Sequence, residues 1–231
     1  MDCLSFEALH FGYVLAPGAV GRKAVHAMRR IRYAHGEDDM LTEVPRRLFT
    51  AAEYHQMARA GILRDGEPVE LIDGEIVQMA PIGHRHWVCV NRATALFSES
   101  FGRKAMVAIQ GPIQLDDWNE PEPDVVVFKS RSDFYQEKRA SPEDVLFIVE
   151  VADSSLAYDR KVKLTRYAKA GIQEYWIEDL NNDVLLVFRD PSGEAYHTFF
   201  EFRAGDSVSP LAFPHATFKI DDLLGQRPSI T

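Results

Sequence analysis

The feature that most constrains the fold of this chain is an apolar run at 145–151, interrupted by a single acid, Glu150. Such near-continuous runs are typical of strands that are buried on both faces. A helical pattern over 159–170, which ends at Gly171, and a further strand pattern at 174–178 follow it. A strand–helix–strand passage normally joins neighbouring parallel strands by a right-handed crossover. We therefore predict a mixed α/β fold with a central, largely buried sheet.

Shorter patterns predict the remaining helices and strands. Thr50 and Glu53 have the spacing of a capping box, which predicts a helix to about residue 59. Asp73-Gly74 lies between two short apolar runs and predicts a β-hairpin, because glycine accepts the positive φ of a tight turn. Apolar residues recur at three- and four-residue steps over 86–101, as in an amphipathic helix. Further strands are predicted at 106–115, 125–128, 184–189 and 196–203, before an irregular tail that contains prolines.

The first residues of the chain differ from the rest in character. Residues 1–47 show no regular period and carry 7 basic and 6 acidic side chains, whereas the remaining residues carry 19 and 29. We interpret 1–46 as a poorly ordered extension, or as the product of an upstream start codon wrongly chosen. The interval 47–226 is interpreted as one domain and 227–231 as a tail.

Composition excludes several classes of function. The chain has 26 Lys+Arg and 35 Asp+Glu, and the net charge of −9 argues against a general nucleic-acid coat protein. No run approaches the roughly 18 uncharged apolar residues of a membrane helix, so no membrane contact is expected. Two cysteines, Cys3 and Cys89, exclude a disulfide scaffold and fit the reducing cytoplasm.

Acidic residues near strand ends are the candidates for chemistry. Glu120, Glu122 and Asp124 precede the strand predicted at 125–128, and Glu150 lies near the end of the apolar strand. A buried carboxylate is costly unless it is paired or bound to a metal. Two carboxylates on adjacent strands suit Mg²⁺, which prefers oxygen ligands and keeps several waters. A metal held there can polarise a phosphoryl oxygen and lower the pKa of a bound water.

The helix predicted at 159–170 complements these acids. Asp159, Lys163 and Tyr167 are spaced i, i+4, i+8 and would share one face. If that face meets the carboxylates, Lys163 would hold the attacking water and offset the charge that develops on a phosphate. Residues 159–169 have five basic side chains and one acid, and those predicted to contact nucleic acid are Arg160, Lys161 and Arg166.

Each feature also has an ordinary structural interpretation. A glutamate at a strand end often lies at the solvent boundary, and Asp159 with Lys163 could form a simple helix salt bridge. A Ser154–His86–Asp124 triad can be assembled on paper, but the sequence has no nucleophile-elbow motif. The ordered succession of acid, acid and lysine over three consecutive elements favours a site.

Several segments, taken jointly and in order, resemble a known family. They are Phe49-Thr-Ala-Ala-Glu-Tyr, Val69-Glu-Leu-Ile-Asp-Gly-Glu-Ile-Val-Gln-Met-Ala-Pro, Pro81-Ile-Gly-His-Arg-His, Gln110-Gly-Pro-Ile-Gln-Leu, Glu120-Pro-Glu-Pro-Asp, Phe147-Ile-Val-Glu-Val-Ala-Asp-Ser-Ser, Tyr158-Asp-Arg-Lys-Val-Lys-Leu-Thr-Arg-Tyr-Ala-Lys-Ala-Gly-Ile and Glu174-Tyr-Trp-Ile-Glu-Asp. From about residue 48 to 224 the chain resembles the Uma-type family of putative restriction endonucleases, within the PD-(D/E)XK nuclease superfamily.

The resemblance implies a restriction-endonuclease-like domain over 47–226, with a central mixed sheet flanked by helices. It implies that Asp124 is the aspartate of the superfamily motif and Glu150 the second acid. The superfamily lysine would stand where this chain has Ala152, and the resemblance implies that Lys163 of the next helix replaces it. Supporting residues implied near the site are Glu70, His86, Gln110, Asp159 and Tyr167.

The leading hypothesis is a Mg²⁺-dependent endonuclease acting on DNA, with Mn²⁺ as a second candidate metal. Asp124 and Glu150 would bind the ion with the backbone carbonyl of Val151, and Lys163 would position water. Ala152 and the acidic charge of the body motivate an alternative, a catalytically inactive nuclease-fold module that binds nucleic acid or protein. RNA is a third, less favoured substrate. A homodimer is expected only by analogy, because cutting both strands needs two sites.

Overall fold

The computed structural model describes residues 45–225. The chain divides into two units, Met1–Leu48 and Phe49–Thr231, and of the first only residues 45–48 are described. All but the last two residues of the extension predicted at 1–46, and the whole tail predicted at 227–231, lie outside the described residues. Within residues 45–225, no helix combines the length and apolar character needed to cross a membrane.

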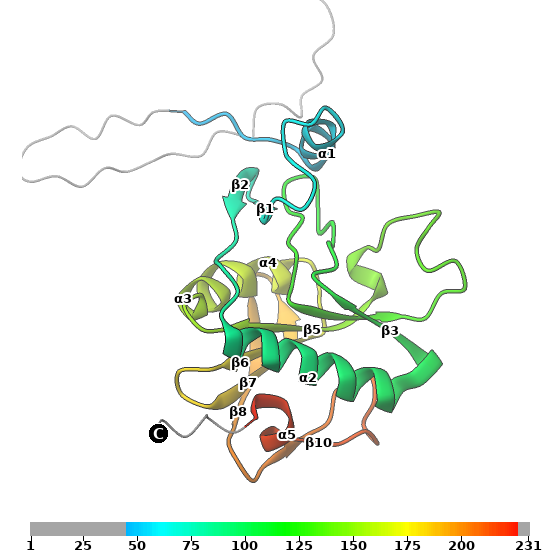
Figure 1. Ribbon diagram of the computed structural model, residues 1–231, viewed down its shortest axis with the longest axis vertical. Coiled ribbons are helices and arrows are strands. Elements are labelled where there is room, and N and C mark those ends of the chain that lie inside the picture. Colours follow the sequence, from blue (N-terminus) through cyan, green and yellow to red (C-terminus); the bar gives the residue numbers. More distant parts are fainter. Residues whose placement is uncertain (1–44, 226–231) are drawn as a thin grey trace, which may run out of the picture. The chain divides into compact units, whose positions relative to one another are not determined.

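The second unit is built on a six-stranded mixed sheet (Figure 1). Its strands follow one another in chain order, and every neighbouring pair is antiparallel except the parallel pair β5–β6. The predicted crossover therefore joins these two strands, which confirms the mixed α/β architecture. The strands are β3 (Ala105–Ile109), β4 (Val125–Lys129), β5 (Val145–Ala152), β6 (Glu174–Asp179), β7 (Val184–Ser192) and β8 (Ala195–Phe202).

Helices cover both faces of this sheet. On one face, α2 (His84–Phe101) and α5 (Ile220–Leu224) enclose a core in which Phe97 packs edge-on against Phe147 and Trp176. The other face is covered by the β5–β6 crossover, whose Tyr167 packs against Tyr175. This crossover consists of α3 (Leu156–Tyr158), a π-helical turn (Asp159–Lys163) and α4 (Leu164–Lys169).

A hairpin and a short helix form a separate part of the same unit. The helix α1 (Ala51–Arg59) begins with the predicted capping box, in which Thr50 and Glu53 exchange hydrogen bonds. The strands β1 (Val69–Ile72) and β2 (Glu75–Gln78) pair with each other, and Leu71 of β1 also forms an antiparallel bridge with Glu120. Asp73 and Gly74 take φ of 52° and 75° in the turn. This β1–β2 hairpin is anchored to the crossover by an ion pair between Arg166 and Asp73, with 2.6 Å between Nε and Oδ1.

Three regions differ from the sequence-based expectations. The strand predicted at 106–115 ends at Ile109, because Gln110 takes a φ of 48° and leaves the β region. The helix predicted at 159–170 is interrupted by the π-helical turn, and a regular hydrophobic period does not reveal such a turn. The tail, expected to be irregular, contains β9 (Ser207–Val208), β10 (Phe218–Lys219) and α5, which are too short to show a period.

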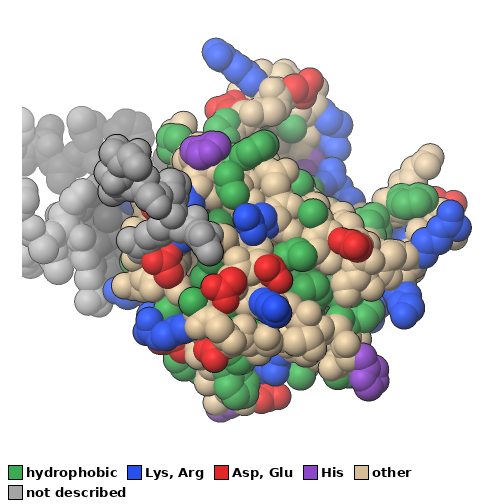
Figure 2. All heavy atoms as spheres, turned by 60° about the horizontal axis from the view of Figure 1, so that its bottom comes forward, with side chains coloured by type: hydrophobic (Ala, Val, Ile, Leu, Met, Phe, Trp, Pro, Cys, Tyr) green, Lys and Arg blue, Asp and Glu red, His purple; other side chains and the backbone are tan. Residues whose placement is uncertain are grey.

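The surface shown in Figure 2 carries both signs of charge. Lysine and arginine side chains are interspersed with aspartate and glutamate, and no single sign covers this face. On this face, attraction to a polyanion would therefore be local.

Candidate active site

A pocket of about 330 Å³ lies where the hairpin, the start of α2, the start of β4, the end of β5 and the crossover meet. Six acidic side chains line it, against one lysine and one histidine. They are Glu70, Glu122, Asp124, Glu150, Asp153 and Asp159, with Lys163 and His86. The pocket thus gathers most of the predicted acids with the lysine and the histidine, whereas the predicted Glu120 lies outside its lining and pairs with His55 and Arg139.

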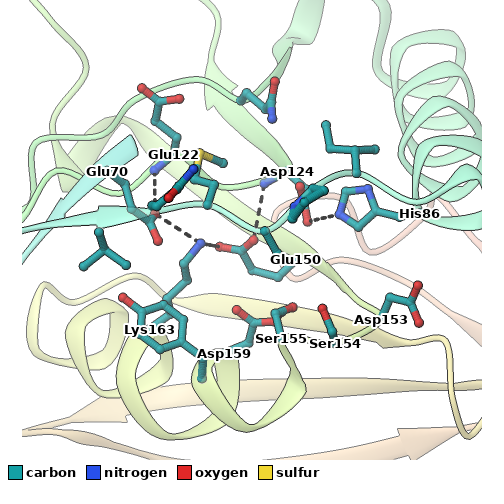
Figure 3. Close-up of a pocket in the computed structure, with 18 of the residues that line it drawn as sticks. Glu70, His86, Glu122, Asp124, Glu150, Asp153, Ser154, Ser155, Asp159 and Lys163 are labelled. Carbon is teal, nitrogen blue, oxygen red and sulfur yellow. Dashed lines mark hydrogen bonds and ion pairs between the residues drawn. The ribbon is translucent and has the colours of Figure 1, made fainter. Parts of the chain in front are cut away.

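Lys163 lies between two acids of the site and contacts both (Figure 3). Its Nζ lies 3.1 Å from Oε1 of Glu150 and 3.2 Å from Oε2 of Glu70. All three side chains are buried, with Lys163 only 6% exposed, Glu70 2% and Glu150 3%. Ala152, which occupies the superfamily's lysine position, is fully buried in the core. The ammonium group reaches Glu150 from the crossover, and the role of Lys163 in place of the superfamily lysine stays a prediction.

Asp124 lies beside Glu150 because β4 and β5 are antiparallel, with Val125 opposite Val149. Oδ2 of Asp124 accepts a hydrogen bond from the backbone N–H of Val151 at 2.8 Å, and the N–H of Asp124 donates to Oε2 of Glu150 at 3.4 Å. The N–H and C=O of one strand residue point to the same side. The carbonyl of Val151 therefore faces the edge that carries Asp124.

His86 meets the same aspartate from α2. Its Nε2 lies 3.0 Å from Oδ2 of Asp124. Burial lowers the pKa of His86, but the hydrogen bond to Asp124 and the charge of that carboxylate outweigh burial, so the pKa is raised above its usual 6.5. The imidazole therefore gains cationic character next to the acid.

Two further predicted residues support the site from the crossover. Tyr167 Oη donates to Oε1 of Glu150 at 2.8 Å, from a fully buried ring. Asp159 lines the pocket, and its Oδ2 accepts from Ser155 Oγ at 2.6 Å. Gln110 also lines the pocket, and its backbone N–H donates to the carbonyl of Asp124 at 3.2 Å.

The electrostatics of the pocket favour an added positive charge. Burial raises the pKa of Glu150 well above its usual range, Lys163 opposes the shift, and Asp124 adds to it. Burial raises the pKa of Asp159 to about 6, with Lys163 again opposing. Burial would lower the pKa of Lys163, but Glu150 and Glu70 raise it above its usual value, so the amine stays protonated. One lysine does not balance this many carboxylates.

The donor set fits a hard divalent cation. Among residues 45–225, no group of three or more His, Cys, Asp or Glu side chains is arranged to hold a metal ion. Mg²⁺ does not need such a group, because it is commonly bound through one or two carboxylates, waters and substrate oxygens. The adjacent carboxylates of Asp124 and Glu150, in a pocket with excess negative charge, supply that smaller set.

The basic residues predicted to contact nucleic acid lie outside the pocket. Arg160 and Lys161 are exposed on the π-helical turn, and Arg166 is engaged with Asp73 of the hairpin. Their contact with nucleic acid stays a prediction.

Sequence reasoning did not assign a role to several pocket residues. Asp153, Ser155 and Tyr158 line the pocket. Glu122, already named among the acidic candidates, lines it as well, and its N–H donates to Oε2 of Glu70 at 3.2 Å. Tyr158 escaped notice because an α-helical period places it away from Lys163. The sequence did hold one indication of Tyr158: the segment that resembles the family begins at this residue, directly before the helix face predicted to carry Lys163.

Comparison with known proteins identifies the fold and the family of the chain. A crystal structure described as a putative nuclease belonging to DUF820, from Anabaena variabilis ATCC 29413, superposes with a TM-score of 0.61 at 19% sequence identity. The match covers 76% of this chain and 97% of the other, and it shows a shared fold. No curated protein matches significantly. The model of the Uma2 family, described as "Putative restriction endonuclease", matches residues 51–221, so this chain belongs to that family.

Proposed function

We propose that this protein is a metal-dependent endonuclease that hydrolyses phosphodiester bonds in DNA. The observation that carries the proposal is the buried set of Asp124, Glu150 and Lys163, which lie at one pocket with the lysine ammonium 3.1 Å from Glu150. Membership of a family described as restriction endonucleases supports the same chemistry.

Each residue has a role that its surroundings suit. Asp124, Glu150 and the carbonyl of Val151 would hold Mg²⁺ or Mn²⁺, which supplies Lewis acidity and lowers the pKa of a bound water. Lys163 would orient the attacking water and stabilise charge on the phosphate. Tyr167 holds the carboxylate of Glu150, and Glu70 holds the ammonium of Lys163. His86 would keep Asp124 in place.

Two substitutions test the proposal. Asp124→Ala and Lys163→Met are expected to abolish Mg²⁺-dependent cleavage of a labelled DNA duplex, because each removes a group that nothing else in the pocket replaces. Lys169→Met is the matched control, since Lys169 lies on α4, is exposed, and makes only a 3.8 Å contact with Glu194. Full cleavage by Lys163→Met would contradict the assigned role of the lysine.

A nuclease-fold module without activity is the alternative, and Ala152 in the lysine position motivates it. Calorimetric titration with Mn²⁺ separates the two. Wild type is expected to bind the ion and Glu150→Gln to bind it far more weakly. Absence of binding to wild type would favour the inactive module. Comparing single- and double-stranded DNA and RNA at matched salt tests the substrate class, and sedimentation in the presence of DNA tests for a homodimer.

A further inference from the structure

Tyr158, the last residue of α3, carries a buried hydroxyl without a partner. Among the described residues no group hydrogen-bonds to its Oη, although the residue lines the pocket. Buried polar groups in proteins are ordinarily hydrogen-bonded, and an unpaired one bears its full desolvation penalty. A group that enters the pocket can supply the missing acceptor.

The π-helical turn places this hydroxyl on the side of Lys163. Five residues separate the two positions, and in an α-helix they would point about 140° apart. In the turn Asp159–Lys163 the N–H of Leu164 donates to the carbonyl of Asp159, an i→i+5 hydrogen bond that accommodates one residue more than the α-helical bond does. Both Tyr158 and Lys163 consequently line the same pocket. π-helical turns are frequent at functional sites.

The charges around Tyr158 keep its phenol protonated. Burial raises the pKa of Tyr158 above its usual 10, and the carboxylate of Glu70 raises it further, while Lys163 opposes the shift. The hydroxyl therefore acts as a hydrogen-bond donor. Because Tyr158 and Lys163 line the same pocket, their two groups can donate to one anionic oxygen there.

We propose that Tyr158 contacts the substrate, its Oη donating a hydrogen bond to a non-bridging oxygen of the phosphate that is held beside Lys163. The inference rests on the proposed nuclease function and adds a substrate-binding hydroxyl to it. Tyr158 does not touch Asp124 or Glu150 by any described hydrogen bond, so its contribution is separable from metal binding.

Stability provides the first test, because Tyr158→Phe removes only the oxygen. Urea unfolding of this variant is expected to match wild type or shift to higher urea, since no internal bond is lost. Tyr196→Phe is the matched control, because Tyr196 Oη donates to the carbonyl of Ile172 at 2.8 Å and lies outside the pocket lining. The control is expected to lower the folded-to-unfolded ratio roughly five-fold.

Cleavage and metal binding provide the second test. With Mn²⁺ and a short labelled DNA duplex, Tyr158→Phe is expected to lower the single-turnover rate at least about ten-fold. Its Mn²⁺ affinity, measured by calorimetry, is expected to equal that of wild type. Tyr196→Phe should cleave normally.

The outcomes separate this inference from the proposed function. If wild type cleaves and Tyr158→Phe cleaves equally well, the inference fails and the proposed function stands. The inference also fails if Tyr158→Phe loses stability as Tyr196→Phe does, because the hydroxyl then has a structural partner. If wild type neither cleaves nor binds Mn²⁺, the proposed function fails and the inference falls with it.

Discussion

Glu178 is a buried acid that the proposed chemistry does not use. It is fully buried on β6, and neither carboxylate oxygen has a hydrogen-bond partner among the described residues. Burial raises its pKa to about 8, and Asp124 adds to the shift while Arg85 opposes it. The folded protein therefore keeps a proton on Glu178 that the unfolded chain releases above about pH 4.5.

This proton makes stability depend on pH in a defined direction. Between about pH 4.5 and 8 the folded state binds more protons at Glu178 than the unfolded state, so the free energy of unfolding falls as pH rises. Glu178→Gln removes the titration and should gain on the order of a few kcal/mol over wild type at pH 8.5, with a smaller difference near pH 5. Urea unfolding at several pH values measures this. Glu201→Gln, on the exposed surface of β8, is the control. A pH-independent difference would contradict the assignment.

At the residue scale, sequence reasoning identified most of the acids and the lysine of the pocket. Glu150 could be singled out because a charge inside an apolar strand demands an explanation, and the structure places it in the pocket, while its role stays a prediction. It could not place Tyr158, whose position depends on a local change of helical geometry. Glu178 escaped for another reason: a glutamate in a strand next to polar turn residues is indistinguishable from a solvent-boundary residue until burial is known.

At the scale of elements, the π-helical turn determines which side chains of the crossover line the pocket. It contains one residue more per turn than an α-helix. Removing that residue restores an α-helical turn without rotating the flanking segments, and Tyr158 and the lysine then stand at i and i+4.

A pair of single-residue deletions tests this account. Deletion of Lys161, exposed within the turn, is expected to preserve folding and Mn²⁺ binding. Deletion of Thr165 in α4 rotates Lys163 by about 100° relative to the buried Tyr167 and should abolish Mn²⁺ binding. Circular dichroism measures folding, and calorimetry measures Mn²⁺ binding. Equal damage from both deletions would count against the role of the turn.

Elements with a strong local signal were predicted well, and those fixed by tertiary contacts were not. The capping box at Thr50, the Asp73-Gly74 turn and the apolar β5 strand each carry their own physical signature. The end of β3 depends on the positive φ of Gln110, and β9 and β10 exist only because they pair with each other. Neither cause is visible in a local window of sequence.

At the scale of the whole molecule, the net charge of −9 and the mixed surface limit general attraction to DNA. Arg160 and Lys161 are exposed next to the site. Each cation that neutralises a phosphate contributes about 0.9 to the slope of log affinity against log salt. Arg160→Ala with Lys161→Ala should therefore reduce that slope by about 2.

Fluorescence anisotropy across a salt series measures this slope. Arg103→Ala with Lys104→Ala is a charge-matched control, since both residues are exposed just after the far end of α2, about 27 Å of helix from the pocket. An equal reduction in both double variants would show that the contacts are not local to the crossover.

The β1–β2 hairpin is expected to open at a lower free energy than the main sheet unfolds. It pairs with no strand of the main sheet, and its Arg166–Asp73 link joins residues 93 positions apart in the chain. Segments attached in this way can open locally at a lower free energy than the core. Such opening would withdraw Glu70 from Lys163 while the sheet persists.

In a urea series, cleavage should therefore decline at a lower concentration than the circular dichroism of the sheet. Coincident transitions would show that the hairpin and the sheet unfold as one unit. If cleavage declines first, mild denaturing conditions would inactivate the proposed nuclease by opening the hairpin, before the sheet unfolds.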